Sequence, residues 1–280
     1  MKKLNIAIVL TVLLTIHSCY TKTKEAKQTT ENASADPELN TKAGAPSRLG
    51  IPIPNDKIVD EFYEAIFSND NTKAREMLET KFPANYEPKN KISPLQAVIS
   101  TSDNLYLAKL LVEKGANING KKEPVTVSCA EYGRLGILKY LVGLKVDIES
   151  NEAFNNAGFH QHYECAKFLL VNGANQEKGD IRGKLWVVEQ AVIKSDYEVL
   201  NLVHLTLAEL NSNNCEGETS LIIAVKQNNR EMVSYLLKRG ADKNKRETFD
   251  CGDDIHYGKT PLKIAVENDY EAIVKLIKAS

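Results

Sequence analysis

The stretch that decides the fold is Gly258-Lys259-Thr260-Pro261-Leu262-Lys263-Ile264-Ala265-Val266, and a similar stretch occurs earlier as Gly217-Glu218-Thr219-Ser220-Leu221-Ile222-Ile223-Ala224-Val225. A second motif, apolar residues followed by Gly-Ala-Asn or Gly-Ala-Asp, keeps step with it at 115–117, 173–175 and 240–242. Small residues near the end of the first motif recur every 28 to 41 residues, at Ala65, Val98, Cys129, Ala157, Ala191, Ala224 and Ala265. Two motifs in phase predict stacked repeats with a period of about 33 residues.

Each position of the unit has a physical role. Thr260 can accept a hydrogen bond as the N-cap of a helix, and Pro261 suits the first helical position because its missing N–H would be unpaired there anyway. Asn228-Asn229 turns the chain, and the apolar residues of 232–237 form the stripe of a second, antiparallel helix. Gly240 ends that helix in the left-handed conformation that glycine adopts readily. The unit is therefore predicted to be two helices followed by a polar turn.

This unit resembles the ankyrin repeat, which implies an all-α solenoid of stacked helix-turn-helix units with short turn fingers. The solenoid is expected over residues 51–280, with an N-terminal cap at about 55–88 and repeats at about 89–121, 122–150, 151–179, 180–212, 213–245 and 246–280. The last two repeats match most closely. In the middle repeats, Lys145 and Leu207 stand where Gly is expected, and Trp186 stands where a capping Thr is expected.

The N-terminus predicts a secreted, lipid-anchored protein. Two lysines at 2–3 precede an apolar run at 6–16, which is too short to span a bilayer as a helix and is typical of a secretory signal peptide. The following Ile16-His17-Ser18-Cys19 resembles a bacterial lipobox. That resemblance implies that residues 1–18 are removed as the signal peptide and that Cys19 carries the lipid, with palmitate as an acyl chain. The alternative is an ordinary signal peptide followed by an incidental cysteine.

Residues 19–50 are almost free of aromatic residues and show no period, so they are predicted to form a disordered tether between the lipid and the repeats. Tyr20 follows the cysteine of the lipobox. By resemblance to the sorting of Gram-negative lipoproteins, this favours the outer membrane and its periplasmic face. We therefore expect the repeats to lie close to a membrane of the bacterial cell envelope without being inserted in it.

Charge and motifs exclude several classes of function. The formal charge of −1 becomes about −3 once the two lysines of the signal peptide are removed, so no basic field favours nucleic acid. His160 and His162 fall between two helices, where polar residues are expected. The inserted loop 249–257 holds a thiol, three carboxylates and an imidazole, but it lacks the spacing of a metal site and an orienting scaffold. We expect no catalytic residue, no metal and no cofactor; an enzyme centred on this loop is the alternative.

The four other cysteines are relevant to the predicted periplasmic location. Cys129 and Cys165 fall at small, inward helix positions and are expected to be buried thiols. Cys215 and Cys251 fall in successive turns between repeats, where an oxidising periplasm favours a disulfide if their Cβ atoms come within about 4 Å. The alternative is two free, partly exposed thiols.

The remaining functional candidate is a surface. The resemblance implies that partners bind the turn tips and the residues that follow the small residue of each first helix, on the concave side. The candidate partner-binding residues are Tyr132, Phe159, His160, Trp186, Ile193, Lys194, Lys226 and Gln227, together with His256 and Tyr257 at the tip of the inserted loop. The row is aromatic and apolar in its middle and polar at its ends, which is the anatomy of a protein interface. For Trp186, packing within a degenerate repeat is an equal alternative.

We therefore expect a monomeric, non-catalytic protein that binds another protein at the periplasmic membrane surface. Secreted ankyrin lipoproteins that resemble this chain include immunity proteins, which neutralise a toxin or effector by covering it. Such blockade needs a large rigid surface, the compartment in which the toxin acts, and no chemistry. The alternative is a structural adaptor that stabilises or tethers a resident periplasmic enzyme or envelope complex.

Overall fold

The computed structural model describes residues 53–89, 91–120, 123–248 and 258–280, and within them it contains fifteen α-helices and no strand. The all-α class predicted from the sequence is confirmed. None of the helices in these ranges is both long and apolar enough to cross a membrane.

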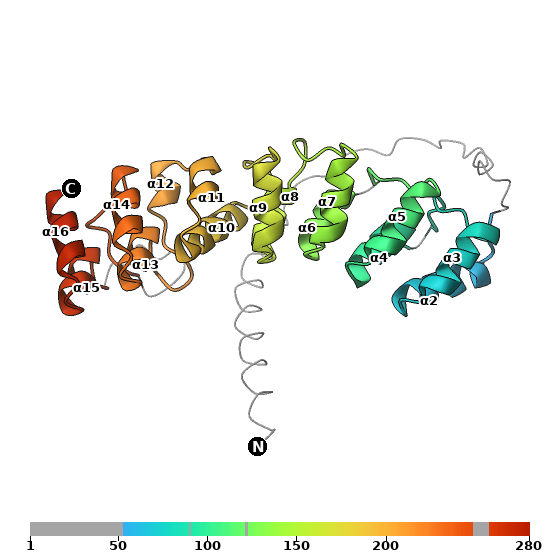
Figure 1. Ribbon diagram of the computed structural model, residues 1–280, viewed down its shortest axis with the longest axis horizontal. Coiled ribbons are helices and arrows are strands. Elements are labelled where there is room, and N and C mark those ends of the chain that lie inside the picture. Colours follow the sequence, from blue (N-terminus) through green and yellow to red (C-terminus); the bar gives the residue numbers. More distant parts are fainter. Residues whose placement is uncertain (1–52, 90, 121–122, 249–257) are drawn as a thin grey trace, which may run out of the picture. The chain divides into compact units, whose positions relative to one another are not determined.

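The helices form two rows (Figure 1). The first helices of the units are α2 (Asp56–Phe67), α4 (Pro94–Thr101), α6 (Val125–Glu131), α8 (Ala153–Phe159), α10 (Ile181–Lys194), α13 (Ser220–Lys226) and α15 (Pro261–Glu267). The second helices are α3 (Asn71–Thr80), α5 (Leu105–Glu113), α7 (Leu135–Gly143), α9 (Tyr163–Val171), α11 (Tyr197–Leu202), α14 (Arg230–Lys238) and α16 (Glu271–Ala279), and α12 (Leu207–Leu210) is an additional short helix. Each first helix packs on the second helix of its own unit, and each one before α15 also packs on the first helix of the next unit.

Capping residues explain where the regular first helices begin. Ser93 accepts a hydrogen bond from the backbone N–H of Gln96 at 3.2 Å, and the Gln96 side chain accepts one from the Ser93 N–H, which completes a capping box. Thr219 and Thr260 each accept the corresponding N–H at 3.2 Å. Pro261 occupies the first position of α15. The roles predicted for Thr260 and Pro261 are confirmed.

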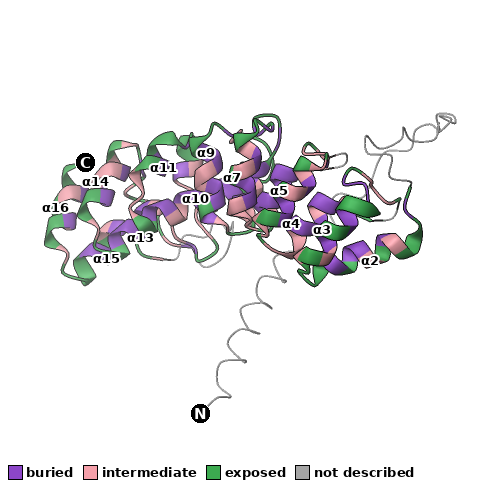
Figure 2. Ribbon diagram, turned by 45° about the vertical axis from the view of Figure 1, so that its right-hand side comes forward, coloured by how far each residue is buried: buried purple, intermediate pink, exposed green. Residues whose placement is uncertain are grey.

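One compact residue in each first helix sets the register of the stack. These residues are at most 1% exposed: Ala65, Val98, Cys129, Ala157, Ala191, Ala224 and Ala265. Figure 2 shows that buried residues occur in each of the helix pairs and that exposed residues lie on their outer sides. In the N-terminal cap, the buried ring of Phe62 stacks on that of Phe82 with centroids 4.0 Å apart. The register predicted from the recurring small residues is confirmed.

Residues with positive φ end several second helices. Gly240 follows α14 with a φ of 92°, as predicted, and Lys145 takes the corresponding place after α7 with a φ of 62°. A lysine in this conformation costs about 1 kcal/mol more than a glycine. Leu207 departs from the prediction, because it is the first residue of α12 and follows the N-cap Thr206. The repeat at 180–212 therefore closes in a different way from its neighbours.

The difference begins at α10, which starts early. Its N-cap is Asp180, which accepts a hydrogen bond from the Arg182 N–H, so that α10 has 14 residues where α13 has 7. Trp186 consequently lies inside α10 and not at an N-cap, which corrects its predicted position. The second helix α11 has only 6 residues, and a capping box of Thr206 and Glu209 then starts α12.

Two glycines allow α10 to approach α8 closely. A Cβ atom at Gly183 would lie 1.8 Å from the backbone oxygen of Asn155, and a Cβ atom at Gly158 would lie 2.2 Å from that of Gly183. A side chain at either position would push the two helices apart. The early start of α10 therefore depends on these glycines.

A buried lysine holds the irregular repeat together. The side chain of Lys184 is 1% exposed, and its Nζ lies 2.8 Å from a carboxylate oxygen of Glu209 and 3.3 Å from one of Glu177. It also donates to the backbone oxygen of His204 at 3.3 Å. Burial alone would raise the pKa of Glu209, but hydrogen bonds from Lys184 and Thr206 outweigh it and lower that pKa. Lys184 thus ties α10 to α12 and to the turn before α10.

The second helices are joined by side chains that reach from one repeat to the next. The ammonium of Lys109 lies 5.5 Å from the ring centroid of Tyr140, and that of Lys139 lies 5.9 Å from the ring of Phe168. Further along, the Tyr235 hydroxyl donates to Asn201 at 2.9 Å. Aromatic side chains on this row are therefore engaged within the stack.

Candidate protein interface

The predicted partner-binding residues lie at equivalent places, at the C-terminal ends of consecutive first helices. They are Tyr132 after α6, Phe159 and His160 at the end of α8, Ile193 and Lys194 at the end of α10, and Lys226 and Gln227 at the end of α13. Because the units stack in register, this arrangement forms a row, which we call the first-helix row. It draws on four successive repeats.

Large apolar side chains are exposed over the first three of the four repeats that form the first-helix row. Tyr132 and Ile193 are each 40% exposed, and Phe159 between them is half-buried. Lys226 and Gln227 at one end are exposed and polar. The described row thus runs from exposed apolar side chains at Tyr132 to exposed polar side chains at Lys226 and Gln227.

Cations cover the two aromatic rings of the first-helix row. The guanidinium carbon of Arg134 lies 5.9 Å from the ring centroid of Tyr132, and that of Arg182 lies 4.9 Å from the ring of Phe159. Arg134 also donates from Nε to the backbone oxygen of Ile99 at 2.7 Å, which links two repeats. The His160 ring meets the edge of Phe159 with centroids 5.3 Å apart. These contacts restrict the rings and reduce the entropy that binding would cost.

A hollow of about 140 Å³ opens beside Phe159. It is lined by Glu152, Asn156, Phe159, His160, Gly179 and Asp180. The first four come from one side of α8 and its ends, and the last two from the turn before α10. The Oδ1 atom of Asn156 is buried and has no hydrogen-bond partner among the described residues. The hollow therefore combines aromatic rings with acceptor groups.

Trp186 has a packing contact. It is half-buried and lies against the hydrophobic core from within α10. This contact agrees with the packing alternative, and a role of Trp186 in binding stays a prediction.

The charged end of the row is partly neutralised within the chain. The ammonium of Lys226 pairs with Glu218 and lies 2.5 Å from a carboxylate oxygen of Glu247. Burial alone would lower the pKa of Lys226, but these hydrogen bonds raise it. Lys226 is therefore held between two carboxylates.

The histidines differ in role. His160 is exposed in the row, whereas His162 is half-buried, with Nε2 3.0 Å from the backbone oxygen of Glu131 in the preceding repeat. Burial lowers the pKa of His162. His162 thus joins two repeats as a hydrogen-bond donor.

The thiols follow the burial predicted for them where the structure describes them. Cys129 and Cys165 are buried, and burial raises the pKa of Cys165 to about 11. Thiols of this kind are poor nucleophiles. Cys215 is exposed in the turn before α13. Cys19, Cys251, His256 and Tyr257 lie outside the described residues, so the lipid anchor, the disulfide and the binding role of the loop stay predictions.

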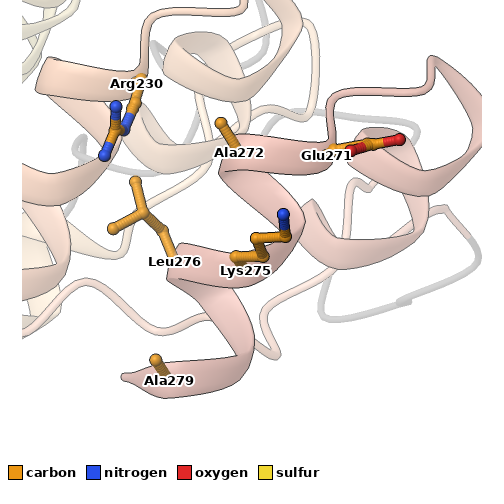
Figure 3. A pocket seen from close by; sticks show the side chains of 6 residues that line it. All are labelled: Arg230, Glu271, Ala272, Lys275, Leu276 and Ala279. Atoms are coloured by element: carbon orange, nitrogen blue, oxygen red, sulfur yellow. The ribbon is translucent and has the colours of Figure 1, made fainter.

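A second hollow, of about 490 Å³, lies away from the first-helix row (Figure 3). It is open and is lined by α14 and α16 through Arg230, Glu271, Ala272, Lys275, Leu276 and Ala279. In the part of the chain that the structure describes, no three His, Cys, Asp or Glu side chains are placed to hold a metal ion.

The hollow beside Phe159 contains residues that the sequence did not single out, namely Glu152, Asn156 and Asp180. Glu152, Asn156 and Phe159 are spaced four and three residues apart, which places them on one side of a helix. That spacing is readable from the sequence. The contribution of Asp180 cannot be predicted from the sequence, because it depends on the early start of α10.

Comparison with known proteins identifies repeats in the C-terminal part of the chain, where a family model described as ankyrin repeats in three copies matches residues 188–280. An L-asparaginase of Dirofilaria immitis is 26% identical over 188 residues, which are 64% of this chain and 30% of that protein. The potassium channel AKT2/3 of Arabidopsis thaliana is 27% identical over 152 residues, 52% of this chain and 17% of the channel. The chain thus spans less than a third of the length of these two relatives.

An ankyrin repeat protein of fowlpox virus (strain NVSL) is 29% identical over 170 residues, 55% of this chain and 86% of the viral protein. Among solved structures, the human ASB11 ankyrin repeat domain is similar with a TM-score of 0.51 and 18% identity, over 77% of this chain and 96% of that domain. At this identity the likeness shows the fold alone.

Proposed function

We propose that this chain, which folds as an ankyrin-repeat solenoid, binds a protein partner without catalysing a reaction. The observation that carries the proposal is the apolar part of the first-helix row, where Tyr132 and Ile193 are each 40% exposed beside the half-buried Phe159. A partner that covers these side chains gains the free energy of burying apolar surface, about 25 cal/mol per Å². The polar residues at the end of the row supply the rim that such interfaces have.

The proposed compartment is the bacterial cell envelope, with the lipid on Cys19 holding the repeats at the outer membrane, facing the periplasm. The lipobox-like sequence and the signal-like N-terminus support this proposal. Cys19→Ala is expected to move the protein out of the membrane pellet, because the acyl chains provide the anchor. Unchanged fractionation together with an unchanged mature mass would contradict the lipid anchor.

Within this class we propose an immunity protein, which neutralises a toxin or effector in the periplasm by stoichiometric binding. Blocking a toxin requires a preformed surface and no chemistry of its own. Helices that pack in register, with rings restricted by neighbouring cations, provide such a surface at low entropic cost.

Capture of the partner tests the proposal. Tagged protein that retains Cys19 is purified from envelope extract, and the bound proteins are identified by mass spectrometry. A toxin that the chain binds one to one and inhibits supports immunity. A resident envelope enzyme with unchanged or increased stability supports the adaptor role instead. Failure to bind any protein through the first-helix row would contradict the proposal as a whole.

A further inference from the structure

We propose that the hollow between α8 and the turn before α10 receives an arginine side chain of the protein partner. This inference rests on the proposed function, because it names the chemistry that the first-helix row recognises. It follows from the size of the hollow, from its acceptor groups and from a contact that the chain makes with its own arginine.

The volume fits one planar group. The hollow measures about 140 Å³, and an apolar cavity of about 150 Å³ in a protein accommodates benzene. A guanidinium with its adjoining methylene groups is of similar size. A whole folded segment would not enter, so this hollow suits a single side chain that projects from a partner.

Two of the polar side chains that line the hollow, Glu152 and Asn156, have acceptor oxygens without a donor among the described residues. Glu152 is exposed and has no basic partner in the described part of the chain. The buried Oδ1 of Asn156, one turn further along α8, accepts no hydrogen bond there. An arginine carries five N–H donors and no acceptor, so it can satisfy a carboxylate and an amide oxygen at once.

The aromatic rings that line the hollow also suit a guanidinium. Phe159 and His160 line the same hollow and meet edge to face. A guanidinium stacks on aromatic faces because it is planar, delocalised and weakly hydrated. A lysine ammonium would meet the carboxylate but would lack the plane that stacks.

The chain already shows this chemistry next to the hollow. The guanidinium of Arg182 lies 4.9 Å from the ring centroid of Phe159, and its Nε donates to both carboxylate oxygens of Asp180 at 3.0 Å. Asp180 is thereby neutralised, which leaves Glu152 as the uncompensated charge of the lining. An anionic ligand is disfavoured, since the charge of Glu152 leaves the lining negative.

Titration with a blocked arginine, N-acetyl-arginine methylamide, tests the inference by NMR. The side-chain amide of Asn156 and the ring resonances of Phe159 and His160 are followed in the intact repeat protein. We expect a saturable shift of these signals with the blocked arginine, a weaker one with the blocked lysine, and none with blocked citrulline, which has nearly the same shape without the charge.

Variants locate the binding. Glu152→Gln removes the charge and keeps the size, and we expect it to weaken binding of the blocked arginine about tenfold, the effect of losing one hydrogen bond to a charged group. Glu164→Gln, at an exposed carboxylate on α9, serves as the matched control and should bind as the parent does. Equal shifts with arginine and citrulline, absence of any saturable shift, or equal binding by Glu152→Gln and the parent would overturn the inference.

Failure of the arginine inference can be distinguished from failure of the proposed function. If the blocked arginine does not bind but the double variant Tyr132→Ala, Phe159→Ala of the first-helix row loses the partner, the row is an interface and the arginine inference is wrong. If the blocked arginine binds while this double variant keeps the partner, the hollow has the stated chemistry but the partner uses another surface. That result contradicts both the proposed interface and the assignment of the arginine to the partner.

Discussion

The repeats at 180–212 and 213–245 are neighbours in sequence, yet they reach the same register by different means. In the second, Thr219 caps a 7-residue helix and Gly240 closes the unit with a φ of 92°. In the first, Asp180 caps a 14-residue helix and no glycine closes the unit. Ala191 and Ala224 are nevertheless both completely buried at the equivalent position. The compact residue between first helices, and not the cap or the closing glycine, is the feature that the two repeats share.

The two repeats also differ in how they use charge. Lys184 in the irregular repeat is 1% exposed, whereas Lys226 in the regular repeat is 41% exposed, although each lies between two carboxylates. A buried pair costs desolvation, while an exposed pair contributes little. The irregular repeat thus replaces a standard turn with polar contacts inside the protein.

The largest effect is expected where α10 crosses α8. Gly183→Ala places a Cβ atom where the backbone oxygen of Asn155 is only 1.8 Å away, and this overpacking should cost about 3 kcal/mol of unfolding free energy. Gly143→Ala is the matched control, because a Cβ atom there would have no atom within 4 Å. It should change stability by about 0.5 kcal/mol, in the stabilising direction. Chemical denaturation measures both.

If Gly183→Ala unfolds at the same denaturant concentration as Gly143→Ala, α10 does not cross α8 as described, and the irregular repeat would resemble its neighbour. Hydrogen exchange should also show that the loss of protection is concentrated in α8 and α10, since each unit of a solenoid contacts only its neighbours.

A smaller effect is expected at the two lysines. Lys184→Ala removes a buried aliphatic chain and both of its ion pairs and should cost about 2 kcal/mol. The same change at Lys226 should cost about 0.5 kcal/mol, because that pair is exposed to solvent and screened. Lys184→Met, which keeps the packing, should recover more than half of the loss. Equal losses at the two lysines in denaturation experiments would remove the distinction between the repeats.

The smallest effect is expected at Glu189 on α10. Burial raises the pKa of this carboxyl, which Glu216 and Glu218 raise further, against a hydrogen bond with Asn214 that lowers it. Protonated Glu189 therefore contributes stability that is present at acidic pH and lost as the pH rises through the folded-state pKa. Glu189→Gln imitates the protonated form, so we expect about 0.5 kcal/mol of added stability at neutral pH.

The difference between Glu189→Gln and the parent should disappear when the pH falls below the ordinary carboxyl pKa, where the parent is protonated in both states. Unfolding free energies measured over this pH range check the sign. A variant that is less stable than the parent at neutral pH would show that the charged form of Glu189 is favoured in the fold.

The sequence predicts the regular parts of this molecule well and the irregular repeat poorly. The register of Ala224 and Ala265 is predicted correctly because the N-caps, the apolar spacing and the glycines of their repeats all indicate the same helix positions. Around Trp186 these signals conflict. The repeat period predicts that Trp186 stands at the N-cap of α10, whereas the structure has Asp180 at that N-cap. The capping signature of Thr206 and Glu209 was readable and indicates the start of α12. The period of the repeat, however, predicts a closing glycine at the position of Leu207.

The candidate surface also has one part that the sequence predicts and one part that it does not. Tyr132, Phe159 and Ile193 follow from the repeat period, since equivalent positions fall in one row. The hollow beside Phe159 does not, because it forms only where the early start of α10 brings Asp180 against α8. Contacts between distant segments of this kind depend on tertiary packing and leave no local pattern.

Partner capture by the double variant Tyr132→Ala, Phe159→Ala is the direct test of whether the first-helix row is the interface. We expect this variant to unfold at the same denaturant concentration as the parent and to lose partner affinity by at least tenfold, because truncating a central aromatic side chain costs about 2 kcal/mol or more. Tyr106→Ala, a tyrosine that is 50% exposed on the second helix α5, is the control and should keep the partner. A folded double variant that binds as tightly as Tyr106→Ala would contradict the claim that the first-helix row is the interface.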